Sequence, residues 1–203
     1  MSVRDRLNSI PFVRIMNRRR DVEPVSSDIA EVAPPRVLLV GNPNVGKSVV
    51  FGRLTGAYAT VSNYPGTTVE VSRGMAALDG GRCELIDTPG MYSLMPISEE
   101  ERVARAMVLW GTVDLVIHVA DARTLDRMLP FTLQLIEAGL PVVLAINMMD
   151  EADRAGVKID ASALERRLTV PVVKMAAAAG RGVDDLRAVV NGIVFGIRDA
   201  AAV

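Results

Sequence analysis

The sequence predicts an α/β fold in which a mostly parallel, six-stranded sheet carries helices on both faces. Two observations support this fold class: strand-like apolar runs alternate with helical patterns, and a glycine-rich loop separates the first run from the first helix. Strand-like runs begin near Arg36, Thr68, Arg82, Asp114, Pro141 and Val172, and helical runs begin near Lys47, Glu99, Leu125, Ala161 and Val183. With 203 residues and 50% apolar residues, the chain can bury one sizeable core, which we expect within residues 36–199.

The loop at residues 41–48 has the pattern G-x-x-x-x-G-K-S and lies between the apolar run 36–40 and a helical stretch. In such a loop backbone N–H groups surround phosphate oxygens, and the following helix N-terminus favours negative charge. The pattern predicts a P-loop nucleoside triphosphate site, with Lys47 reaching the β- and γ-phosphates and Ser48 binding Mg²⁺. The residues expected to contact the nucleotide here are Gly41, Asn42, Pro43, Asn44, Val45, Gly46, Lys47, Ser48 and Val49.

The segment Asn147, Met148, Met149, Asp150 follows the buried-strand pattern of residues 141–146. A strand of a parallel sheet delivers such a segment to the carboxyl edge, where ligands bind. The Asp150 carboxylate can accept hydrogen bonds from guanine N1–H and the N2 amine, whereas adenine would leave it unpaired. The segment therefore predicts a guanine nucleotide, with Asn147 bracing the loop.

Two further loops match the parts that sense a γ-phosphate. Asp87 to Gly90 follow a short strand, so Asp87 can hold a water on Mg²⁺ and the Gly90 N–H can contact the γ-phosphate. In the loop at residues 63–70, a threonine hydroxyl can complete the Mg²⁺ shell when GTP is present. We assign Thr68 rather than Thr67, because Thr68 directly precedes an alternating strand pattern.

Residues 41–48, 63–70, 87–94 and 147–152 together resemble the cytosolic GTPase domain of the FeoB family of bacterial ferrous iron transporters. The stretch 132–137 is similar to the helix that precedes the guanine-reading strand in that family. The resemblance covers about residues 36–190, and the N-Y-P-G-T-T-V-E and D-T-P-G-M-Y-S-L runs are its most specific parts.

The resemblance implies a slow GTPase that is stimulated by K⁺. Met91 stands where Ras-like enzymes have a water-orienting glutamine, so catalysis must rest on positioning and charge neutralisation. By similarity to FeoB and to potassium-activated GTPases, Asn44 is expected to bind K⁺ beside the phosphates. The expected catalytic residues are Lys47, Asn44, Thr68 and Gly90, and Mg²⁺ is held by Ser48, Thr68 and, through water, Asp87.

The guanine side departs from the usual patterns at two places. Met148 replaces the lysine of N-K-x-D, which predicts weaker nucleotide binding and faster GDP release. The last guanine loop, expected as Ser-Ala, contains Ala176, Ala177 and Ala178, and we assign the backbone contact with guanine O6 to Ala177. The missing serine hydroxyl predicts a less firmly braced loop.

The remaining single residues suggest structural roles. Ser98 to Glu101 form a capping-box pattern, followed by a predicted core stripe of Val103, Met107 and Trp110. Cys83 and His118, the only residues of their types, lie in predicted strands and read as core residues.

Residues 1–35 differ from the rest, because an arginine-rich part (1–20) precedes an acidic, proline-containing part. Residues 1–35 fit a disordered leader with a proline-rich linker, and the alternative is that the basic residues 1–20 contact an anionic membrane surface. No apolar run is long enough to span a bilayer. The resemblance to FeoB implies a membrane permease region, in the same or another polypeptide, as the partner, and a location at the cytoplasmic face of the inner membrane.

A net charge of −1 argues against nucleic acid. Two other classes stay open: a ribosome- or RNA-associated assembly GTPase, and a GTP-sensing module that does not hydrolyse GTP.

Overall fold

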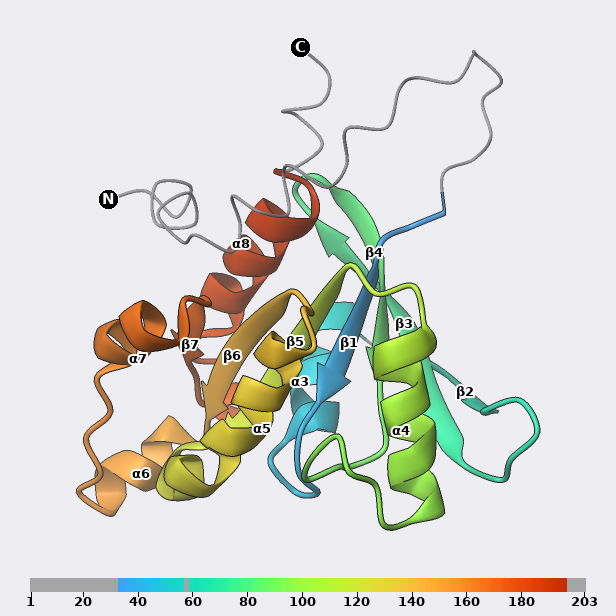
Figure 1. The fold of residues 1–203 in the computed structure, drawn as a ribbon. Coiled ribbons are helices and arrows are strands. Elements are labelled where there is room, and N and C mark those ends of the chain that lie inside the picture. Colours follow the sequence, from blue (N-terminus) through green and yellow to red (C-terminus); the bar gives the residue numbers. More distant parts are fainter. Residues whose placement is uncertain (1–32, 57–58, 197–203) are drawn as a thin grey trace.

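The computed structural model describes residues 33–56 and 59–196, which form a seven-stranded sheet with helices on both faces (Figure 1). The sheet order is β2-β3-β4-β1-β5-β6-β7; β2 and β3 pair antiparallel, as do β3 and β4, and the other pairs are parallel. The strands are β1 (Arg36–Val40), β2 (Ala59–Asn63), β3 (Glu70–Leu78), β4 (Gly81–Asp87), β5 (Leu115–Asp121), β6 (Val142–Asn147) and β7 (Val172–Lys174). The predicted fold class is confirmed.

The strand count predicted from the sequence is wrong by one, because the edge strand β2 was not foreseen. All five residues of β2 are exposed, so its sequence lacks the alternation of buried and exposed positions that marks a strand. Of the proposed leader at residues 1–35, residues 1–32 lie outside the described residues, and these include the basic part at 1–20.

The helices are α3 (Lys47–Thr55), α4 (Glu99–Trp110), α5 (Leu125–Glu137), α6 (Met149–Arg154), α7 (Ala161–Leu168) and α8 (Val183–Val194), with short 3-10 turns η1 (Ala122–Thr124) and η2 (Ala177–Ala179). Phe51 of α3 and Leu186 of α8 belong to one core cluster, whereas Met107 of α4 and Phe131 of α5 belong to a second cluster. Within the described ranges, no helix is long and apolar enough to cross a bilayer.

The strand register brings the carboxyl ends of four strands to one edge of the sheet. Leu39 of β1 pairs with Asp87 of β4, Val40 pairs with His118 of β5, and Asp121 at the end of β5 pairs with Asn147 at the end of β6. The loops that follow these strands therefore meet at the same edge, which is where ligands bind in open α/β sheets.

Helix α4 confirms one sequence prediction and contradicts another. The Ser98 side chain accepts a hydrogen bond from the Glu101 N–H, and the Glu101 side chain returns to the Ser98 backbone, as the capping-box pattern predicts. Val103 and Met107 are buried, but Trp110 is 76% exposed. The helix ends at Trp110, so no further turn covers the ring, which instead lies 5.6 Å from the Arg105 guanidinium carbon.

Candidate nucleotide-binding site

The loop between β1 and α3 takes a conformation that requires glycine. Gly46 has φ of +89° and is the N-cap of α3. A Cβ added to Gly46 would lie only 2.4 Å from Asn147 Nδ2, so a larger residue there would displace the asparagine. Asn44, the residue assigned to K⁺, is exposed and also has positive φ.

Lys47 is buried within this loop, although it carries a charge. Its Nζ donates to the Asn42 carbonyl oxygen at 3.2 Å. Burial lowers the pKa of the Lys47 ammonium, and the nearby Asp87 carboxylate opposes this shift. A buried ammonium needs further acceptors, and phosphate oxygens at the N-terminus of α3 can supply them.

Ser48 and Asp87 form the second polar pair of the site, since Ser48 Oγ donates to Asp87 Oδ2 at 2.6 Å. Asp87 Oδ1 is buried and has no hydrogen-bond partner within the described part of the chain. Burial raises the pKa of the Asp87 carboxyl, and the Ser48 hydrogen bond and the Lys47 charge oppose that rise. A hydroxyl oxygen beside an unpartnered carboxylate oxygen fits Mg²⁺, which prefers oxygen ligands and keeps several waters.

The loop after β4 packs directly against the phosphate loop (Figure 1). The Thr88 hydroxyl donates to the Leu39 carbonyl at 2.8 Å, and the Met91 N–H donates to the Gly41 carbonyl at 3.0 Å. A Cβ at Gly90 would lie 2.7 Å from Pro43 Cγ, so only glycine permits this approach. The Met91 side chain is 0% exposed and therefore packs in the core rather than facing the site.

The structure does not join Thr68 to the magnesium pair, because no hydrogen bond links Thr68 with Ser48 or Asp87 among the described residues. The neighbouring Thr67 hydroxyl donates to the Tyr64 carbonyl and accepts from the Val69 N–H, so it closes the loop between β2 and β3. Thr68 is exposed and is thus the threonine of this pair whose hydroxyl the turn does not use.

Asn147 links the phosphate side of the site to the guanine side. Its Nδ2 donates to the Val45 carbonyl at 3.0 Å, and its Oδ1 accepts from the Ala177 N–H at 2.9 Å. Both hydrogen bonds are buried. The side chain therefore braces the phosphate loop and the loop at residues 176–179 at the same time.

The loop at residues 176–178 has a brace that the sequence analysis missed. Arg53 of α3 donates to the Ala177 carbonyl at 3.0 Å and to the Ala178 carbonyl at 2.6 Å. No local pattern could reveal this contact, because 124 residues separate Arg53 from Ala177. The Ala177 N–H, assigned from sequence to guanine O6, is engaged with Asn147 in this structure, whereas Ala178 is exposed.

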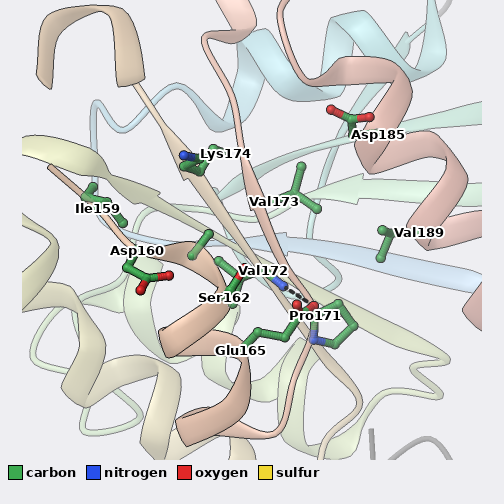
Figure 2. A pocket seen from close by; sticks show the side chains of 11 residues that line it. Ile159, Asp160, Ser162, Glu165, Pro171, Val172, Val173, Lys174, Asp185 and Val189 are labelled. Carbon is green, nitrogen blue, oxygen red and sulfur yellow. Dashed lines mark hydrogen bonds between the residues drawn. The ribbon is translucent and has the colours of Figure 1, made fainter. Parts of the chain in front are cut away.

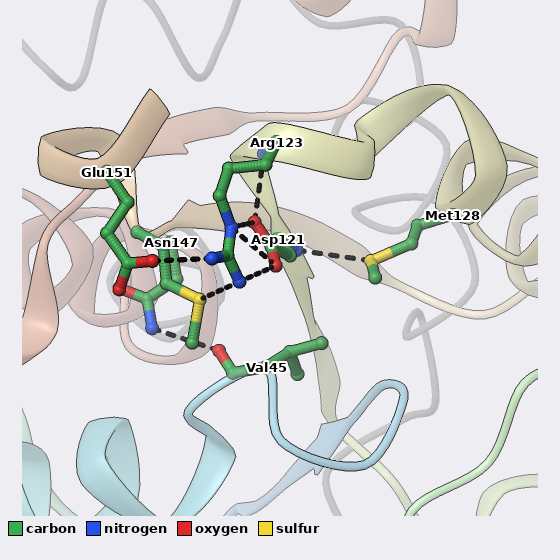
Figure 3. A network of polar contacts seen from close by, with 7 residues as sticks. Val45, Asp121, Arg123, Met128, Asn147 and Glu151 are labelled. Atoms are coloured by element: carbon green, nitrogen blue, oxygen red, sulfur yellow. Dashed lines mark hydrogen bonds and ion pairs between the residues drawn. The ribbon is translucent and has the colours of Figure 1, made fainter. Parts of the chain in front are cut away.

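Asp150 and Met148 lie at the start of α6. Met148 is the N-cap with φ of 61°, and Asp150 is in the first turn, where its Oδ2 accepts from Arg154 at 3.1 Å. Arg123 of η1, which the sequence analysis also missed, contacts Asp121 and Glu151 (Figure 3). Its Nη2 also lies 3.5 Å from the Met148 sulfur.

A cavity of about 420 Å³ lies elsewhere, between α7, β7 and α8 (Figure 2). None of the predicted site residues lines it. Two of its acids are used within the fold, because Asp160 caps α7 and Glu165 accepts from the Val172 N–H. Among the described residues, no group of three or more His, Cys, Asp and Glu side chains could hold a metal ion.

Comparison with known proteins identifies relatives of this chain. Residues 35–190 match the family described as Ferrous iron transport protein B. The Fe(2+) transporter FeoB of Salmonella typhimurium is 43% identical over 157 residues, which are 75% of this chain and 20% of that protein. The Fe(2+) transporter FeoB of Escherichia coli (strain K12) is 40% identical over the same length. The chain thus spans about a fifth of the length of these curated relatives.

The solved structures that resemble this one include isolated G domains. The G domain of the T. maritima FeoB iron transporter is 39% identical with a TM-score of 0.72, and the match covers 77% of this chain and 97% of that one. The FeoB G-domain from Methanococcus jannaschii is 37% identical with a TM-score of 0.70, covering 80% and 99%. The family match, the shared fold and the phosphate and guanine loops lead to one assignment: this chain belongs to the ferrous iron transport protein B family and contains the GTP-binding G domain of that family.

Proposed function

We propose that this domain binds GTP with Mg²⁺ and hydrolyses it to GDP and phosphate. The observation that carries the proposal is the cluster of Lys47, Ser48 and Asp87, which places a buried ammonium, a hydroxyl and an unpartnered carboxylate oxygen at the N-terminus of α3. Each of these groups fits a part of a magnesium-bound triphosphate.

The chain's own residues would act mainly by positioning and by neutralising charge. The chemistry that Mg²⁺ would supply when bound is positive charge that offsets the negative charge of the phosphates. Ser48 would hold the ion directly and Asp87 through water, while Lys47 and the Gly90 N–H would hold the phosphates. The buried Met91 side chain cannot orient the attacking water, which supports a slow intrinsic rate.

Guanine selectivity is assigned to Asp150, which would accept hydrogen bonds from N1–H and the N2 amine of the base. The last loop would add a backbone N–H to guanine O6. Because the Ala177 N–H is occupied by Asn147, we now assign this contact to the exposed Ala178. Arg53 supports the assignment, since it holds the carbonyls of both alanines.

Potassium would act beside the phosphates, at Asn44. Asn44 belongs to the loop that would surround the triphosphate. Its side chain is exposed and its backbone is left-handed, so the side chain is accessible to a cation. A cation there would neutralise transition-state charge as an arginine finger does in other GTPases.

The output of the domain would be a GTP-dependent change in two segments, residues 63–70 and 87–101. Thr68, whose hydroxyl is exposed, would join the Mg²⁺ shell only with GTP, and the second loop follows the γ-phosphate through Gly90. The curated relatives are Fe(2+) transporters, so we propose a permease region at the cytoplasmic face of the inner membrane as partner and Fe²⁺ uptake as the process.

The test is phosphate release from GTP by the purified chain, in potassium and in sodium at equal ionic strength. We expect potassium to stimulate release, and Asn44→Ala to abolish the stimulation but not GTP binding. Equal rates in both salts would remove the potassium proposal and leave the GTPase. No release in either salt, with GTP bound, would favour a sensing module, the second candidate that the buried Met91 side chain supports.

A further inference from the structure

We propose that Arg123 is a positioning residue for guanine recognition. Its guanidinium links the end of β5 to α6, the short helix that carries Asp150. This inference rests on the proposed GTP binding. Arg123 would supply, from another part of the chain, the cation that the usual N-K-x-D segment has at the position of Met148.

The Arg123 guanidinium contacts two carboxylates from different elements (Figure 3). Its Nε donates to Asp121 Oδ1 at 3.0 Å and its Nη2 donates to Asp121 Oδ2 at 2.6 Å, so the arginine holds the end of β5 with two donors. Its Nη1 donates to Glu151 Oε2 at 2.5 Å, on α6. Two parallel donors fix the plane of a guanidinium, which a lysine cannot do.

The same guanidinium lies against the substituted position of the guanine segment, since Arg123 Nη2 is 3.5 Å from the Met148 sulfur. A positive charge is thus present beside residue 148 although residue 148 itself is uncharged. The charge is supplied by a side chain 25 positions earlier in the chain.

Helix α6 needs such support, because it is short and weakly capped. It has six residues, and its N-cap Met148 makes no side-chain hydrogen bond to the helix. A helix of this length is not stable by itself, so neighbouring contacts must set its direction. The Met149 N–H donates to the Met175 carbonyl at 3.1 Å, and the Arg123–Glu151 pair adds an ionic contact one residue beyond Asp150.

Asp121, which holds the Arg123 guanidinium at the end of β5, is itself held in a fixed position. The Asp121 side chain is only 10% exposed, and Asp121 also accepts from the Arg123 backbone N–H at 2.8 Å. Burial by itself would raise the pKa of the Asp121 carboxyl, but the hydrogen bonds and charge of Arg123 outweigh it, so the pKa is lowered. Asp121 therefore stays ionised and holds the guanidinium at physiological pH.

The test compares Arg123→Ala with Arg127→Ala, a control that removes an exposed arginine of α5. We expect Arg123→Ala to weaken GDP and GTP binding about fivefold, since the pair with Glu151 is partly exposed. The preference for GTP over inosine triphosphate should also fall, because inosine lacks the N2 amine that Asp150 must meet. KM for GTP should rise while kcat at saturation stays the same.

Three further measurements separate positioning from a general loss of structure. Binding of magnesium tripolyphosphate, which uses the phosphate loop without a base, should be unchanged in Arg123→Ala. Glu151→Gln keeps the Asp121 anchor and should change the GTP-to-inosine preference in the same direction by a smaller factor. Arg123→Lys should restore affinity only in part, since one ammonium cannot reproduce the planar contact.

The outcomes distinguish this inference from the function on which it rests. Unchanged affinity and base preference in Arg123→Ala, with normal GTP binding by the parent chain, would overturn the role of Arg123 and leave the GTPase. Parallel loss of GTP and tripolyphosphate binding would also overturn it, because the defect would then be general. Failure of the parent chain to bind GTP would remove both proposals.

Discussion

The phosphate side and the guanine side of the candidate site are held together by different kinds of contact. On the phosphate side, backbone groups and neighbouring motif residues dominate: Lys47 bonds the Asn42 carbonyl, and the Thr88 hydroxyl bonds the Leu39 carbonyl. On the guanine side, arginines from other elements do the holding, with Arg53 on the loop at 176–178 and Arg123 on α6. The residues that hold the phosphate side therefore belong to recognisable motifs, although 49 residues separate Thr88 from Leu39, whereas the guanine side depends on arginines that belong to no motif.

This difference explains why the guanine side tolerates unusual residues. Met148 and the alanines at 176–178 lack the polar side chains expected there, yet Arg53 holds the carbonyls of Ala177 and Ala178 and Arg123 contacts the Met148 sulfur. The phosphate side has no comparable freedom, since Gly46 and Gly90 leave no room for a Cβ against Asn147 and Pro43.

The largest effect is expected on the phosphate side. Lys47→Ala removes the buried ammonium, and we expect GTP affinity to fall at least about 100-fold, because charge-assisted bonds to phosphate are lost. Calorimetric titration of GTP into the protein in the presence of Mg²⁺ measures the change in affinity. Lys158→Ala, which replaces an exposed lysine, is the control. Affinity retained in Lys47→Ala would contradict the assigned phosphate site.

The next effect concerns the base. In Asp150→Asn, the amide no longer offers two acceptor oxygens to guanine, so we expect GTP binding to weaken roughly 50-fold. Xanthosine triphosphate, whose 2-carbonyl can accept from the new amide, should bind better than it does to the parent chain. Competition binding gives both ratios, and Asp153→Asn, on the exposed side of α6, is the control. An unchanged GTP preference would remove Asp150 from base recognition.

Asn147 tests whether the two sides depend on each other. Asn147→Ala breaks its bonds to Val45 and Ala177 and leaves two buried backbone groups unpaired, so the free energy of unfolding should fall by about 2 kcal/mol. Urea denaturation measures this loss. The exposed Asn63→Ala in β2 should change stability by less than about 0.5 kcal/mol. Equal stability of the two variants would show that the sides are independent.

The sequence was sufficient for the parts of the structure that follow from local rules. Buried parallel strands have continuous apolar runs, and the glycines of the phosphate loop mark a backbone that no other residue can adopt. The proximity of Ser48 and Asp87 could be predicted because the loop with Lys47 and Ser48 follows β1, Asp87 ends β4, and these two strands are parallel neighbours.

The parts that could not be predicted depend on the folded chain. β2 is fully exposed, and α6 has six residues, so neither has enough periodicity to be recognised. In the sequence, Arg53 and Arg123 look like ordinary solvent-exposed arginines. Only the folded chain brings Arg53 to Ala177, 124 residues away, and Arg123 to Glu151, 28 residues away. Trp110 fitted the helical stripe, but the end of α4 left it exposed.

The smallest expected effect is on the pH dependence of the free energy of unfolding, which should differ between the two sides. His118 of β5 pairs in register with Val40, just before the phosphate loop, and its ring is buried against Phe131 and Thr132. Burial, with a smaller effect of the Lys47 charge, lowers the pKa of His118 to about 3. The unfolded chain binds this proton below about pH 6.5, so the folded state loses stability as pH falls through that range.

For His118→Gln, which keeps a polar group near Thr132 without a titrating ring, we expect a weaker loss of stability on acidification. Between pH 6.5 and 5.5 the parent chain should lose about 1 kcal/mol more than the variant, measured by urea denaturation at both pH values. The guanine side acts in another window, because the lowered pKa of Asp121 gives stability that is lost only below about pH 4. Equal slopes of the parent chain and His118→Gln above pH 5 would assign the acid sensitivity to carboxyl groups instead of His118.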